Sequence, residues 1–193
     1  MFFDTQLLNL DFVSIVDVFI LLYYFTFASL LIVAFVFDFK HKLIPDFTSY
    51  GILALVLIRL SVSSYQLKAI SYQLTYDFLA ALAVLALFGG IWYFSQGRAM
   101  GFGDVKLAPA ITLFLGFSNG ILAILLSFWL GSFVGLFLIA YSKSRSWHNK
   151  DRDLAKGFSL KSEIPFGPFL VLGALIALLW GERIISLYLN FLE

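Results

Sequence analysis

The sequence contains no cysteine and few charged residues. Of its 193 residues none is Cys, only two are His, and 13% are charged, whereas about 25% of residues are charged in an average soluble domain. The absence of cysteine excludes disulfides, zinc–thiolate sites and thiol nucleophiles. The low charge argues against an ordinary soluble domain, and the net charge of +1 predicts no nucleic-acid partner.

Apolar residues dominate instead. They make up 61% of the chain, aromatic residues make up 19%, and the mean hydropathy is +0.94. This composition predicts an integral membrane protein surrounded by lipid, with an all-α, polytopic helix bundle and residues 1–193 as a single membrane-embedded domain. The first apolar run is preceded by Asp4 and Asp11 rather than by basic residues, so we do not expect a cleaved signal peptide.

Long runs of apolar residues predict the membrane spans. Val18–Phe37, Phe47–Val62 and Phe78–Ser95 are each about long enough to cross a bilayer as a helix, which takes roughly 20 residues. Leu107–Tyr141 holds no charge and is too long for one crossing. A turn at Ser118-Asn119-Gly120 is predicted to divide it into two helices.

The segment before that turn, from about Asp104 to Phe117, is short for a full crossing, so a re-entrant half-helix is the alternative. The last span is predicted over Ile164–Gly181, with an amphipathic tail beyond Glu182.

The basic residues predict the orientation. If six helices cross, ten basic residues fall on one face and three on the other. The face with three carries Arg59, Lys68 and Arg183. We therefore expect about six transmembrane helices with both termini outside and the basic face in the cytoplasm.

Two carboxylates lie at the ends of apolar runs. Asp38 follows the first predicted span, and Asp104 precedes the fourth. Because the chain crosses out and back between them, both are expected on the cytoplasmic side, where a compact bundle would allow them to meet. An aspartate at membrane depth is costly and usually serves a function.

Two adjacent carboxylates cannot both ionise cheaply, so they share a proton. This is the chemistry of an aspartic protease, in which one carboxylate activates a water and the other, protonated, hydrogen-bonds the scissile carbonyl. Such a mechanism needs neither metal nor cofactor, and none is expected. The scarcity of His and the lack of Cys leave few other hydrolytic chemistries.

Each of these acidic residues also has a purely structural interpretation. Asp38 would pair with a neighbouring lysine at the interface, and Asp104 would be a helix N-cap. Asp46, after Pro45, and Asp77 are interpreted as helix caps. Arg59 is expected to extend outward to the membrane surface.

Three residues around Asp104 are candidates for binding substrate. Gly101 and Gly103 would allow the backbone to approach a peptide closely, or they are ordinary loop residues. Lys106 is predicted either to lower the pKa of Asp104 or to bind lipid headgroups.

Several sequence blocks together resemble one known family. Arg98–Ala108, with its Gly-Phe-Gly-Asp core, resembles the signature of the type IV prepilin peptidases, which are membrane aspartic proteases of the GxGD class. Phe37–Asp46 is similar to the segment that carries the family's first aspartate, and Ile164–Phe169 to its Pro-Phe-Gly-Pro block. Leu115-Gly116, Gly131 and Gly135 match its small residues. The order and spacing agree from about residue 18 to 181.

The resemblance implies that Asp38 and Asp104 are the catalytic pair, and that Asp46 occupies a position where Asn also serves. It implies an aspartic endopeptidase of the inner membrane that cuts the basic leader from prepilins or pseudopilins at the cytoplasmic face, for pilus assembly or type II secretion. Lys40 and Lys42 match basic residues that follow the family's first aspartate.

Bacterial members usually begin with a cytoplasmic region bearing cysteine pairs, which is associated with N-methylation. Because this chain has no cysteine, we expect the peptidase core without methyltransferase activity, as a short natural variant or as a fragment. Two other functions compete with the peptidase. One is a proton- or cation-coupled transporter with its site at Asp38 and Asp104, and the other is a silent scaffold of a pilus assembly platform. The sequence predicts no oligomeric state.

Overall fold

A computed structural model describes residues 15–63, 70–98, 100–148 and 165–192. Over these residues the chain forms helices and no strands. The helices are α1 (Ile15–His41), α2 (Asp46–Ser63), α3 (Ile70–Ser95), α4 (Phe102–Leu115), α5 (Phe117–His148) and α6 (Gly167–Leu192). The predicted all-α architecture is therefore confirmed.

Four of these helices are long and apolar enough to cross a membrane: residues Asp17–His41, Tyr72–Ser95, Phe117–Tyr141 and Gly167–Phe191. Their outward faces carry large apolar side chains that are exposed in the isolated chain, as expected for helices that contact lipid. The prediction of a membrane helix bundle is thus confirmed. The number of crossings stays a prediction, because α2 has 18 residues and α4 only 14.

The short helix α4 lies at the centre of the bundle. It packs against α2, α3, α5 and α6, and Leu107, Ala108 and Ile111 are fully buried. Near its C-terminal end, the ring of Phe114 stacks on Phe27 of α1, with 3.7 Å between the ring centroids. A helix surrounded on all sides by others holds its side chains in fixed positions, so α4 is a rigid support for whatever it carries.

The break between α4 and α5 lies at Gly116, so the prediction of a turn at Ser118-Asn119-Gly120 was wrong. Those three residues lie within α5. Gly116 has φ +84°, a conformation that glycine adopts without strain. Its own backbone N–H donates to Thr112 O at 3.0 Å and closes the last turn of α4.

Side chains from two other helices satisfy the backbone groups that this break exposes. The backbone N–H of Phe117, the first residue of α5, donates to Asp77 Oδ1 of α3 at 2.7 Å. Arg59 Nη1 of α2 donates to the carbonyl of Phe114 at 3.3 Å. Asp77 is thus a helix cap, as predicted, but it caps α5 rather than its own helix. Arg59 is also exposed, and its extension to the membrane surface stays a prediction.

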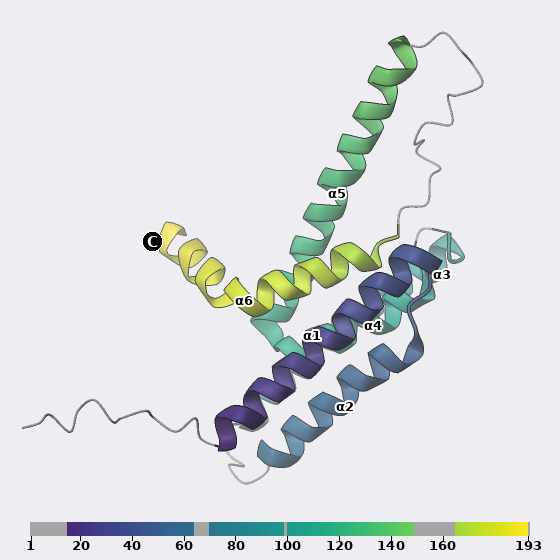
Figure 1. Cartoon of the computed structure of the whole chain (residues 1–193). Coiled ribbons are helices and arrows are strands. Elements are labelled where there is room, and N and C mark those ends of the chain that lie inside the picture. Colours follow the sequence, from purple (N-terminus) through teal and green to yellow (C-terminus); the bar gives the residue numbers. More distant parts are fainter. Residues whose placement is uncertain (1–14, 64–69, 99, 149–164, 193) are drawn as a thin grey trace, which may run out of the picture.

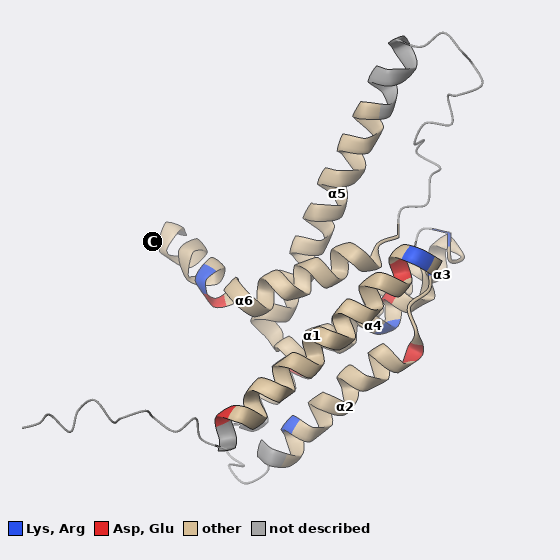
Figure 2. Ribbon diagram, in the orientation of Figure 1, with Lys and Arg blue, Asp and Glu red and all other residues tan. Residues whose placement is uncertain are grey.

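The ends of the helices carry most of the charge. Figure 2 shows basic and acidic residues near the ends of α1 and α2 and uncharged middles in these two helices, whereas α6 carries an acidic and a basic residue in its interior. In Figure 1, α1 and α2 run side by side and antiparallel, and α5 extends away from the rest of the bundle. The last helix begins at Gly167 and continues unbroken through Leu192, past the predicted end at Gly181. Residue 164, where that span was expected to begin, lies outside the described residues, as does Lys68.

Candidate active site

Asp38 and Asp104 come from different helices and are both nearly buried. Asp38 lies in the last turn of α1 and Asp104 in the first turn of α4, and their exposed fractions are 6% and 5%. They are close enough for the charge of Asp38 to act on Asp104. The structure therefore brings together the two carboxylates that the sequence analysis paired.

The two carboxylates have acceptor atoms that no protein group satisfies. Asp38 Oδ2 and Asp104 Oδ1 are buried and have no hydrogen-bond partner. In the described part of the chain only two other buried side-chain polar atoms share this property. Buried polar groups are nearly always hydrogen-bonded in proteins, so an unsatisfied pair at one place indicates a site that takes up a water or a substrate group.

Asp104 differs from an ordinary aspartate in its protonation. It belongs to α4, which is not among the four helices long enough to span the membrane. Burial, and after it the negative charge of Asp38, raise the pKa of the Asp104 carboxyl to about 7, against a smaller opposing effect of the Gly101 backbone. A carboxyl that keeps its proton near neutral pH is able to donate a hydrogen bond.

The interpretation of Asp104 as an N-cap was wrong. The N-cap of α4 is Gly101, which makes no side-chain cap, and Asp104 already belongs to the helix. Its backbone N–H donates to the carbonyl of Gly101 at 3.2 Å. The side chain meets the Gly101 backbone, and its Oδ1 is left for other interactions.

The first residue of α6 completes the surroundings of Asp38. The backbone amide of Gly167 faces the Asp38 carboxylate, so the carboxylate lies at the positive end of the α6 dipole. A Cβ on Gly167 would lie only 2.8 Å from Asp38 Cγ, so only glycine leaves room there. The sequence analysis did not name Gly167 as a site residue. The signal for it was the Pro-Phe-Gly-Pro block, which contains Gly167.

Gly103 and Gly101 have different surroundings. A Cβ on Gly103 would lie 2.7 Å from Ile44 Cβ, whereas a Cβ on Gly101 would be 3.7 Å from Asp104 Oδ2, an ordinary contact distance. Gly103 therefore allows the segment between α1 and α2, which contains Ile44, to pack tightly on α4. This packing gives Gly103 a role that the sequence analysis missed, and substrate binding by either glycine stays a prediction.

Lys106 pairs with Asp46 and not with the catalytic candidates. Its Nζ donates to Asp46 Oδ1 at 2.8 Å and lies 4.6 Å from the centroid of the Phe102 ring. The hydrogen bond from Lys106 to Asp46 raises the pKa of the lysine. Asp46 is the first residue of α2, so a helix does begin there, and its role as a cap stays a prediction. The ion pair joins this helix start to α4, beside the segment that packs on Gly103.

Among the described residues there is no group of three or more His, Cys, Asp or Glu side chains placed to hold a metal ion. The described residues instead provide the carboxylates of Asp38 and Asp104. These lie among three helix ends: the C-terminal end of α1 and the N-terminal ends of α4 and α6. The fold and this site together define an all-α membrane protein with a buried aspartate pair at one end of its bundle.

Comparison with known sequences identifies the family. A family model described as the type IV leader peptidase family matches residues 25–136, and the chain belongs to this family. It is 31% identical over 157 residues to a prepilin leader peptidase/N-methyltransferase of Stutzerimonas stutzeri, covering 80% of this chain and 48% of that protein. The protein of the same name from Legionella pneumophila is 32% identical over 156 residues, with the same coverage.

A third relative of that name, from Aeromonas hydrophila, is 35% identical over 117 residues, which are 58% of this chain and 36% of that protein. The chain thus spans about half the length, or less, of these curated relatives. No solved structure matches the chain.

Proposed function

We propose that this protein is an aspartic endopeptidase that removes the basic leader from type IV prepilins or pseudopilins at the cytoplasmic face of the inner membrane. The observation that carries the proposal is the buried pair of Asp38 and Asp104, each with a carboxylate oxygen that lacks a protein partner. The relatives' names support the substrate class.

The geometry supports different roles for the two carboxylates. Asp104 holds its proton up to a pKa of about 7, and two neighbouring carboxylates share one proton. Asp38 is therefore assigned as the ionised member of the pair. In the proposed reaction Asp38 takes a proton from a water as the water oxygen attacks the scissile carbonyl carbon. The Asp104 carboxyl hydrogen-bonds the carbonyl oxygen.

The tetrahedral intermediate then collapses. The carbon–nitrogen bond breaks, the leaving amine takes up the proton that Asp38 accepted, and the new carboxyl terminus stays on the leader. One water is consumed and no metal or cofactor takes part. The pair returns to one protonated and one ionised carboxylate.

The predicted topology fits a leader with basic residues. A basic segment stays preferentially in the cytoplasm, so its scissile bond would lie at the face where Asp38 and Asp104 are expected. Gly101, Gly103 and Lys106 flank Asp104 on the same end of α4 and are proposed to contact the bound leader.

The test is cleavage of a prepilin with a basic leader by the purified protein in liposomes. We expect leader release by the wild type and none by the Asp38→Asn or Asp104→Asn proteins, each still folded by thermal melting. Asp46→Asn is the matched control, because Asp46 is an aspartate at the same end of the bundle, 60% exposed and outside the pair. It is expected to cut at nearly the wild-type rate.

A folded Asp38→Asn or Asp104→Asn protein that cuts normally would overturn the assignment. If no protein cuts although the leader binds, the scaffold function is favoured. If the wild type instead moves protons or cations into the liposomes, and both Asp→Asn proteins lose this flux, the transporter is favoured.

A further inference from the structure

The helices α2 and α3 leave a gap beside α4. Both pack against α4, but over the described residues they make little or no contact with each other. A groove of about 600 Å³ lies in this gap. Its walls include Leu53 and Leu57 of α2 and Phe78 and Leu79 of α3, and Leu113 of α4 lines it between them.

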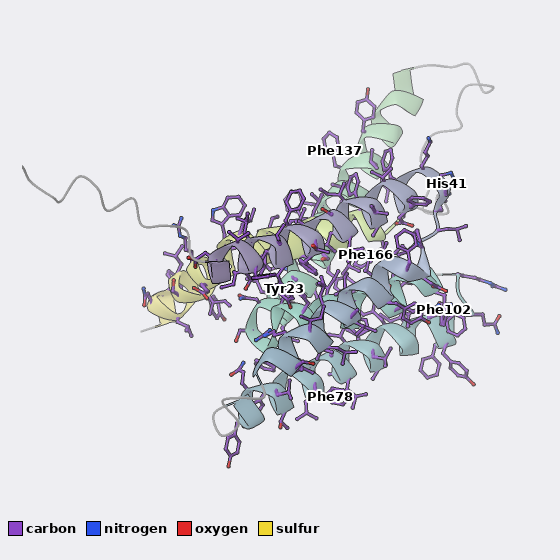
Figure 3. All side chains as sticks on the ribbon, turned by 60° about the horizontal axis from the view of Figure 1, so that its bottom comes forward. Tyr23, His41, Phe78, Phe102, Phe137 and Phe166 are labelled. Atoms are coloured by element: carbon purple, nitrogen blue, oxygen red, sulfur yellow. The ribbon has the colours of Figure 1, made fainter. Side chains whose placement is uncertain are left out.

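The groove lies in the half of the bundle away from the two aspartates. Figure 3 shows Phe78 away from His41 and Phe102, which are close to the aspartates in the sequence. Leu113 belongs to the last turn of α4, whereas Asp104 is in the first. The candidate active site therefore does not account for this groove.

The lining of the groove is apolar. Of the described residues that line it, only Thr75 has a polar side chain, and Thr75 already has an interaction partner. An ordered water needs about two to four polar partners, which this lining does not offer. Leu57, Phe78 and Leu79 are exposed, so the groove opens on a surface that faces lipid. The expected occupant is therefore apolar and comes from the membrane.

The size of the groove decides between a helix and an acyl chain. Along α2 the lining runs from Leu53 to Leu60, which at about 1.5 Å per residue is about 10 Å. A helix is itself about 10 Å wide with its side chains and needs about 30 Å to cross a bilayer, so it is too large to enter. An acyl chain is a single file of carbon atoms that spans one leaflet, about 15 Å. One acyl chain therefore fits.

We propose that the groove between α2 and α3 holds one acyl chain of a membrane phospholipid. An empty groove would leave the side chains around it without contact partners, because dispersion attraction is lost across a void. In a bilayer this packing, rather than the hydrophobic effect, favours the bound state. The chain lies against Leu113 in the last turn of α4 and completes the packing around the helix that carries Asp104.

The test places a photoreactive group inside the groove. Leu113 alone is replaced by photo-leucine, a diazirine analogue of leucine, and the purified protein is irradiated in liposomes of phosphatidylethanolamine and phosphatidylglycerol. The diazirine loses nitrogen, and the carbene inserts into a bond of whichever molecule is in contact with it. The mass of the product therefore identifies the occupant. We expect a phospholipid adduct whose fragments place the link on an acyl chain.

Two further substitutions fill the groove from its walls. Leu57→Trp and Leu79→Trp are each expected to lower the yield of the adduct at position 113 about tenfold, because overpacking an occupied site is unfavourable. Leu82→Trp is the matched control. Leu82 belongs to α3, like Leu79, and is exposed to a similar degree, 51% against 53%, but it does not line the groove. Its substitution should leave the yield unchanged.

Four results would overturn the proposal. A link between two copies of the chain would show a protein occupant, and addition of water to the carbene would show a solvent-filled groove. A link to the lipid headgroup would exclude an acyl chain as the occupant. An unchanged yield in both Leu57→Trp and Leu79→Trp would show that the lipid lies outside the groove.

Thermal melting checks that each variant is folded. If one of the two groove-filling variants does not fold, the other decides, and the identity of the adduct at position 113 is read without either of them. None of these results depends on whether the protein cleaves prepilins.

Discussion

Gly167, the first residue of α6, lies against the carboxylate of Asp38 near the end of α1. Its backbone amide faces the carboxylate, and the absence of a side chain makes the close approach possible. The position of Asp38 thus depends on Gly167, a residue that is distant in the sequence and has no side chain.

Gly167→Ala is therefore expected to reduce leader cleavage by at least about tenfold. The added Cβ would lie 2.8 Å from Asp38 Cγ, so the carboxylate must move, and misplacement of a catalytic group by about 1 Å costs on the order of a hundredfold in rate. Cleavage kinetics in liposomes measure this. Gly135→Ala is the matched control, because a Cβ there meets nothing within 4 Å. Normal cleavage by a folded Gly167→Ala protein would contradict the contact.

Gly103→Ala is expected to lower both stability and cleavage, since its Cβ would lie 2.7 Å from Ile44 Cβ. The second change Ile44→Gly removes the Cβ that obstructs it and should restore much of the lost cleavage, as a double-mutant cycle would show. Gly101→Ala is the comparison, because the added Cβ would make only an ordinary contact. If Gly101→Ala raises KM without lowering the melting temperature, Gly101 contacts substrate. An unrescued double variant would argue against the role of Ile44.

Cleavage is expected to fall as the pH rises through about 7. Burial and the charge of Asp38 raise the pKa of Asp104 to about 7, so the acid that hydrogen-bonds the carbonyl is present below that pH and is lost above it. The measurement is kcat/KM against pH with a leader peptide whose own charge is constant over the range. A rate that stays constant up to about two pH units above that pKa would show that Asp104 does not act as the acid.

Comparison of Lys106→Gln with Asp46→Asn distinguishes a structural role of the Lys106–Asp46 ion pair from a role in substrate binding. Both changes break the same 2.8 Å contact, and because the pair is largely exposed, each should change the melting temperature only slightly. If Lys106 contacts the leader, Lys106→Gln raises KM and Asp46→Asn does not. Equal effects on KM would assign both residues to holding α2 against α4.

Asp77→Leu is expected to destabilise the fold by about 1–3 kcal/mol, the cost of leaving a buried donor unsatisfied. The donor is the backbone N–H of Phe117, which Asp77 accepts at 2.7 Å. Asp77→Asn keeps an acceptor oxygen and should lose less. Thermal melting in detergent compares the three proteins. A melting temperature unchanged by Asp77→Leu would mean that the start of α5 finds another cap.

The sequence alone predicted the class of fold and the chemistry of the site. Apolar runs of about the length of a bilayer predict helices, because a backbone in lipid must satisfy its own hydrogen bonds. Asp38 and Asp104 stood out because a carboxylate is costly beside such runs. The number of predicted membrane crossings between Asp38 and Asp104 placed both aspartates on the same side of the membrane. These inferences need only composition and spacing, so they required no knowledge of packing.

The tertiary structure decided the contacts between distant segments. The break after α4 lies at Gly116 rather than at the polar Ser118-Asn119-Gly120, because Asp77 and Arg59 from other helices satisfy the exposed backbone at that point. Likewise Gly167 meets Asp38 only because α6 returns to the end of α1. A sequence pattern shows what each residue prefers locally, but which residues meet across the bundle is set by the packing of whole helices, and only the folded chain contains that information.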